Sequence, residues 1–157
     1  MAISSVALAG MISDTSLYNI DGACVVGGAT AIPAGTVVKF TTAQPDGHKI
    51  VEATDLTTGN TLGVVVRSHY ETTDGASRVK EAVNVMTHGR IWVRTDISAA
   101  TDVVFGTPVK VSETGIVQKT GTVDTGWTFA GGFIPNTKTS GGSQSVDGLV
   151  EVQVKQK

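Results

Sequence analysis

The sequence lacks the features that are typical of nucleic-acid-binding proteins, membrane proteins and proteins stabilised by disulfides. Lysine and arginine number 12 against 14 aspartates and glutamates, without a basic stripe, so binding driven by a nucleic-acid backbone is not expected. No apolar run approaches the roughly 18 residues of a membrane span. Cys24 is the only cysteine, which excludes an intramolecular disulfide and a zinc site built from cysteines.

Motifs of catalysis and nucleotide binding are missing as well. The chain has no Gly-x-Ser-x-Gly elbow, no Gly-x-x-x-x-Gly-Lys loop and no Gly-x-Gly-x-x-Gly fingerprint. Cys24 stands in the apolar stretch GACVVGG, which predicts a small buried residue rather than a nucleophile. We therefore expect no enzyme, no catalytic residue and no cofactor.

The composition that remains favours strands and turns. Glycine is abundant at 19 residues, hydrophobic residues make up 40% and charged residues only 17% of the 157 positions. The length predicts a single β domain over residues 21–157, preceded by an N-terminal arm or first strand over residues 1–20. The start of the chain lacks the basic segment of a signal peptide, and its Ile3, Val6 and Leu8 are candidates for strand addition to a partner.

Short apolar stretches between turn signals predict an all-β fold. The clearest is GLVEVQV, where Val150, Val152 and Val154 alternate with polar residues. A short helical turn is expected within residues 95–104. Further strands are predicted at residues 36–41, 49–53, 62–69, 109–112, 116–119 and 127–134.

The sequence also contains an internal echo. AIPAGTVVKF at residues 31–40 resembles DVVFGTPVKV at residues 102–111, an offset of 71 from Gly35 to Gly106. Ile50-Val51 matches Ile116-Val117, and GNTLG matches GWTFAG, at offsets of 66 and 67. Either the chain holds two similar halves, each a hairpin followed by a strand, or the matches are coincidence among residue types that suit strands. Two such halves would pack face to face as a β-sandwich or barrel.

The stretch EAVNVMTHGRIWVRTD at residues 81–96 holds most of the candidate interface residues. Its odd positions, from Val83 to Val93, are mostly apolar and predict the core face of one continuous strand. Gly89 then marks a bend, a bulge, or the close approach of a neighbouring backbone. The even face carries His88, Arg90, Trp92 and Arg94. Arginine and tryptophan are enriched at interface hot spots, so a protein interface is favoured over an ordinary solvated face with a cation–π pair.

This stretch also resembles a known family. Together with GVVVRSHYE at residues 63–71 and FGTPVKVSETGIV at residues 105–117, it is similar to the structural cement, or capsid decoration, proteins of tailed bacteriophages. The resemblance implies a non-enzymatic β-sandwich or jelly-roll protein, made in the bacterial host cytoplasm. It would bind the outside of the assembled capsid as a homodimer or homotrimer and bridge subunits of the major capsid protein.

Two alternatives come from other classes. A carbohydrate-binding β-sandwich would use exposed Trp92, Trp127 and Tyr70 to stack on sugar rings; Trp127 is a candidate interface residue under either hypothesis. A metal-dependent enzyme on a small β-barrel would use His48, His69 and His88, although these lack the close pairing typical of a zinc site.

Overall fold

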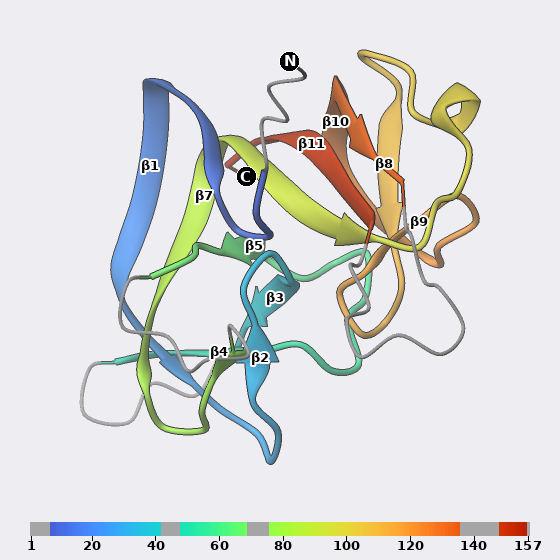
Figure 1. Cartoon of the computed structure of the whole chain (residues 1–157). Coiled ribbons are helices and arrows are strands. Elements are labelled where there is room, and N and C mark those ends of the chain that lie inside the picture. Colours follow the sequence, from blue (N-terminus) through green and yellow to red (C-terminus); the bar gives the residue numbers. More distant parts are fainter. Residues whose placement is uncertain (1–6, 42–47, 69–75, 136–147, 157) are drawn as a thin grey trace, which may run out of the picture.

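A computed structural model describes residues 7–41, 48–68, 76–135 and 148–156 of the chain (Figure 1). These residues form one sheet of nine strands and a small sheet of two strands, β2 and β6. The elements are β1 (Ile12–Val26), β2 (Ile32–Pro33), β3 (Val37–Phe40), β4 (Lys49–Glu52), β5 (Leu62–Val65), β6 (Ala76–Ser77), β7 (Ala82–Thr95), η2 (Ala100–Asp102), β8 (Pro108–Val111), β9 (Val117–Gln118), β10 (Val123–Ile134) and β11 (Gly148–Val154).

The predicted all-β fold and most of the predicted strands are confirmed. The predicted buried face of the C-terminal strand is confirmed, because Val150, Val152 and Val154 are fully buried in β11. The helical turn is the 3-10 turn η2. β5 ends at Val65, earlier than predicted, and β10 begins at Val123, earlier than predicted.

The nine-stranded sheet closes into two five-stranded barrels that share β7. The first ring runs β1-β4-β3-β5-β7, and the β7–β1 pairing closes it. The second ring runs β7-β11-β10-β8-β9, and the β9–β7 pairing closes it. Figure 1 shows β7 between the first barrel, with β1, β3, β4 and β5, and the second, with β8 to β11.

The two barrels repeat one topology. Replacing β1, β4, β3, β5 and β7 by β7, β9, β8, β10 and β11 turns the first ring into the second, and each pairing keeps its direction: β1–β4 and β7–β9 are parallel, the others antiparallel. The pair Lys39–Glu52 corresponds to Lys110–Gln118, at the offsets of 71 and 66 found in the sequence. The two similar halves are therefore present in the fold.

The third sequence match, GNTLG with GWTFAG, pairs two equivalent strands, but the residues that it aligns do not occupy equivalent positions. It aligns Leu62 of β5 with Phe129 of β10. Leu62 lies opposite Lys39, whereas Phe129 follows Thr128, which lies opposite Pro108. Because Lys39 corresponds to Lys110 and not to Pro108, β5 and β10 occupy equivalent places with a shifted register.

The described residues form two apolar cores, and β7 contributes to both; the larger core also takes in Val37 of β3 and Val64 of β5. Val83 and Val85 belong to the smaller core with Cys24 and Val38, whereas Ile91 and Val93 belong to the larger one. The change occurs across Gly89, whose φ of +125° is in the region that favours glycine. A Cβ on Gly89 would lie 2.9 Å from the Cβ of Tyr18 and 3.3 Å from the carbonyl oxygen of Leu17, so of the three expectations for Gly89 the close approach of a neighbouring backbone is observed.

One assignment within β7 was wrong. The even positions were expected to avoid the core, yet Met86 is fully buried in the larger core. Met86 lies opposite Ile20 of β1 and Val64 of β5. A shared strand is covered on both faces where the barrels meet, so simple alternation fails there.

Candidate functional site

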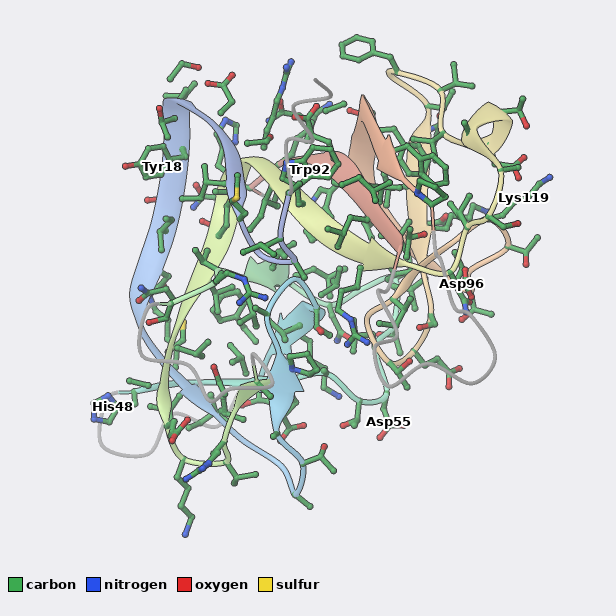
Figure 2. All side chains as sticks on the ribbon, in the orientation of Figure 1. Tyr18, His48, Asp55, Trp92, Asp96 and Lys119 are labelled. Atoms are coloured by element: carbon green, nitrogen blue, oxygen red, sulfur yellow. The ribbon has the colours of Figure 1, made fainter. Side chains whose placement is uncertain are left out.

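The outer face of β7 carries the four polar and aromatic residues singled out in the sequence, and all four are partly exposed. Trp92 lies opposite Glu151 of β11, and Figure 2 shows it between the two barrels. A Cβ on Gly132 of β10 would lie 2.5 Å from the indole Cη2 atom. The indole therefore lies across β11 onto β10, where the missing side chain of Gly132 makes room for it.

Hydrogen bonds hold the polar neighbours of Trp92. Arg90 Nε donates to Gln153 Oε1 at 3.0 Å, and Arg90 lies opposite Asp14 of β1. The pKa of Asp14 is lowered, first by the backbone N–H of Ser16 and to a smaller extent by Arg90. His88 lies opposite Asn19, and the backbone N–H of Arg94 donates to Gly35. The face is thus ordered and carries both signs of charge.

Exposed apolar side chains border this face, and we call this set the apolar rim. Its members are Leu8, Met11, Leu17, Tyr18, Val104 and Phe105. Backbone hydrogen bonds join Gly10 and Met11 to Trp92, Tyr18 touches the position of Gly89, and Phe105 lies 3.7 Å from where a Cβ on Gly131 would be. These contacts place Met11 beside Trp92, Tyr18 beside Gly89 of β7, and Phe105 beside Gly131 of β10.

Only Leu8 of the apolar rim was a candidate from the sequence. Leu17 and Tyr18 lie within the strand β1. Two adjacent large apolar residues are common in strands, so the sequence gives no sign that this pair is exposed. Val104 and Phe105 precede the turn at Gly106. Two adjacent large apolar residues beside a turn glycine were the signal that could have identified the second pair.

The remaining candidates fall elsewhere. Trp127 is only 2% exposed, and its indole N–H donates to the carbonyl of Lys155 at 3.1 Å, so it holds β10 against the C-terminal segment and offers no surface to a partner. Ile3 and Val6 lie outside the described residues. The carbohydrate hypothesis loses Trp127 as a stacking platform, and its Tyr70 also lies outside the described residues.

Among the residues described, no three histidine, cysteine, aspartate or glutamate side chains gather where a metal ion could bind. His48 directly precedes β4, whereas His88 lies on β7 opposite Asn19, and Figure 2 shows His48 at the far end of the first barrel from Trp92. His69 is outside the described part of the chain. The structure therefore does not bring the three histidines of the metal hypothesis together.

Cys24 is buried in the smaller core, as predicted, with 1% of its surface exposed. Burial raises the pKa of its thiol to about 12, and the carboxylate of Asp21 adds to the effect. Asp21 itself forms an ion pair with Lys49. A neutral thiol in this place is a packing group.

The pH dependence of stability provides a test of this burial. Because the pKa of Cys24 is raised on folding from an ordinary 9.0 to about 12, its contribution to stability is complete below pH 9 and is lost as the pH rises toward 12. We expect the urea midpoint of the native protein to fall more between pH 8.5 and 10.5 than that of the Cys24→Ala variant. Parallel curves for the two proteins would contradict a buried neutral thiol.

One of two comparisons with known proteins finds a match for the chain. None of the described helices is long and apolar enough to cross a membrane, and no curated protein matches the chain. The sequence model of one family, described as structural cement protein (E217 gp24/Pam3 gp6), matches residues 3–155. Since that match covers nearly the whole chain, the protein belongs to the structural cement proteins of phages, and its role is a structural one in association with the virion capsid.

Proposed function

We propose that the protein binds the outer surface of the assembled capsid as a homo-oligomer and bridges neighbouring subunits of the major capsid protein without catalysing a reaction. The match to the structural cement family over residues 3–155 carries this proposal. The family places the protein at the capsid; the side of the shell and the bridging contacts are argued from the chain itself.

Charge supports the exterior. A protein lining the inside of a filled capsid meets packaged DNA, whose phosphates favour basic surfaces. This chain has 12 lysines and arginines against 14 aspartates and glutamates, a net charge of −2. Such a balance offers no general attraction to DNA and no strong repulsion from a protein shell.

The shared strand suits a protein that resists outward force. β7 pairs with β1 in one barrel and with β11 in the other, so pulling the barrels apart requires breaking the backbone hydrogen bonds that hold β7 in one of them. Closed barrels also leave fewer strand edges for unwanted pairing when many copies crowd on one shell. Bridging in this way needs binding contacts and stiffness but no reactive group.

Co-sedimentation with expanded capsids that lack the protein tests the proposal. The purified protein should pellet with closed capsids and saturate at a fixed number of copies, and protease added afterwards should reach it. Capsids already carrying a full complement are the control and should bind no more. Failure to bind shells of its own phage, or binding only to broken shells, would refute the exterior role.

Truncation of Trp92 tests whether the outer face of β7 contributes. Trp92→Ala should weaken capsid binding by about tenfold or more, since removing a central tryptophan from an interface commonly costs about 2 kcal/mol; Arg90→Ala should weaken it less. Lys110→Ala, which removes an exposed cation from β8, is the control. If both β7 variants keep native oligomeric state and native shell binding, the interface hypothesis for this face is wrong.

A further inference from the structure

The turn before β3 forms a corner with the end of β5 in the first barrel. Gly35 N–H donates to the Val65 carbonyl at 2.9 Å, and Val65 N–H donates to the Thr36 carbonyl at 3.1 Å. Gly35 has a φ of +77°, and Arg67 follows two residues after Val65. We call the backbone of these four residues the first corner.

Residues 8–11, which we call the strap, lie on the first corner as a turn. Arg67 donates its N–H to the Gly10 carbonyl and its Nε to the Ala9 carbonyl, both at 2.9 Å. A Cβ on Gly10 would lie 2.8 Å from the Arg67 nitrogen and 2.9 Å from the Val65 oxygen, and a Cβ on Gly35 would lie 2.7 Å from the Gly10 nitrogen. The two backbones meet without room for a side chain, so this corner accepts a turn only at a glycine.

The second barrel repeats this corner in the turn before β8. Gly106 N–H donates to the Phe129 carbonyl at 2.9 Å, and Phe129 N–H donates to the Thr107 carbonyl at 3.0 Å. Gly106 has a φ of +82°. The offset of 64 from Val65 to Phe129 places Gly131 where Arg67 lies in the first corner. We call the backbone of Gly106, Thr107, Phe129 and Gly131 the second corner.

The two corners differ in what covers them. Among the described residues other than its chain neighbours, nothing lies within 4 Å of where a Cβ on Gly106 would be. The strap precedes β1, whose counterpart is β7, but the segment before β7 is held elsewhere, because Lys80 N–H donates to the Val26 carbonyl at 2.8 Å. No described segment therefore takes the place of the strap on Gly106.

An apolar side chain stands beside the uncovered corner. Phe105 is 67% exposed, whereas Ala34, its counterpart before Gly35, is 2% exposed. The Phe105 ring lies 3.7 Å from where a Cβ on Gly131 would be, and Gly131 is itself exposed. Figure 1 shows the loop that leads into β8 projecting from the second barrel. The second corner thus combines the backbone shape that holds the strap with an accessible apolar residue.

We propose that the second corner receives a glycine-containing turn of a partner protein, seated as the strap is seated on the first corner. The strap reads Leu-Ala-Gly-Met, so the partner turn needs a glycine after a small residue, with apolar residues on either side that pack against Phe105. Its carbonyl accepts from the Gly131 N–H, as the Gly10 carbonyl accepts from Arg67. The inference deepens the proposed function and rests on it only for the identity of the partner, an exterior loop of the major capsid protein.

A peptide with the sequence of residues 7–13, ALAGMIS, tests the second corner in the full-length protein. The first corner is already occupied, so the peptide at roughly millimolar concentration should shift the backbone amide signals of Gly106 and Gly131 in a nitrogen–proton correlation spectrum. The same peptide with valine in place of its glycine should shift neither, because a Cβ at that position meets backbone atoms at 2.8–2.9 Å on the first corner. No shifts, or equal shifts with both peptides, would overturn the inference.

Gly106→Ala blocks the proposed seat without touching any other described group. Its Cβ has open space in the free protein but stands where the partner backbone would lie, so peptide affinity should fall at least tenfold. Gly126→Ala is the matched control, because Gly126 has a φ of +76°, has nothing within 4 Å of its would-be Cβ and lies outside the second corner. Phe105→Ala, which shortens an exposed side chain and leaves the backbone unstrained, should weaken the peptide severalfold. Native affinity in both Gly106→Ala and Phe105→Ala would contradict the inference.

Binding to expanded capsids separates this inference from the proposed function. Gly106→Ala should weaken co-sedimentation with the shells about tenfold, and Gly126→Ala should leave it unchanged. Equal shell binding by the native protein and Gly106→Ala would refute the capsid protein as the partner and keep the proposed function. A native protein that binds the peptide at the second corner but binds no shell would refute the capsid role and leave the corner standing as a site for a glycine turn.

Discussion

Replacing Gly115 by alanine is expected to destabilise the protein by about 3–5 kcal/mol, or to prevent folding, because two costs add at this position. Its φ of +84° is strained for any residue with a Cβ. The added Cβ would also lie 2.1 Å from the carbonyl oxygen of Val37. Gly115 turns the chain between β8 and β9, and its own carbonyl accepts a hydrogen bond from Val37 N–H at 3.0 Å, so the clash falls where the second barrel contacts β3 of the first.

Gly126→Ala is the matched control for this substitution. Gly126 has a φ of +76°, close to that of Gly115, and nothing lies within 4 Å of its would-be Cβ. Its substitution should cost only the conformational strain, about 1–2 kcal/mol. Urea unfolding at neutral pH measures both variants. Similar losses at the two positions would mean that the contact between the hairpin and β3 contributes little.

The strands were predictable from the sequence where the signal is a local residue pattern or a motif that occurs twice. Alternation placed β11, and the motif Gly-Thr-x-Val-Lys placed β3 and β8 in equivalent settings. Gly35 and Gly106 have φ values of +77° and +82°, so the echo reflects one turn conformation used twice. Such signals survive because each depends on neighbours along the chain.

Closure into two barrels was not predictable in the same way. Whether β7 ends one barrel or also begins another depends on pairings such as Thr95 with Val117 and Cys24 with Lys49, which join distant parts of the chain. The burial of Met86 follows from that sharing. A pattern read along one strand contains no information about how many barrels the strand serves.

The candidate site shows the same division. Trp92 and Trp127 are both flanked by strand residues, yet Trp92 lies on an outer face and Trp127 in the core. The burial of Trp127 could have been predicted if the strand had been taken to begin at Val123, four residues earlier. Trp127 then shares one face with the other odd positions from Val123 to Phe129, all of which are buried. Leu17 and Tyr18 gave no comparable signal, because their exposure depends on a bulge opposite Arg90 and His88.

Ile91→Ala should destabilise both barrels together by about 2–5 kcal/mol. Ile91 is fully buried in the larger core and lies opposite Ile12 of β1 and Val152 of β11. The chain contains a natural reporter for each core: Trp127 in the larger and the thiol of Cys24 in the smaller. β7 is a strand of both barrels. If β7 loses its packing in one barrel, the other barrel therefore loses a strand as well.

Denaturant titration with two probes checks this coupling. Tryptophan fluorescence and labelling of Cys24 should give one shared midpoint in the native protein, and Ile91→Ala should move both midpoints down equally. Val38→Ala, a truncation in the smaller core, is the reciprocal control and should also move the fluorescence midpoint. If Ile91→Ala shifts the fluorescence alone while Cys24 stays protected to the native midpoint, the barrels unfold independently. The shared strand would then join two stable modules, and the stiffness argued for a capsid bridge would have to come from elsewhere.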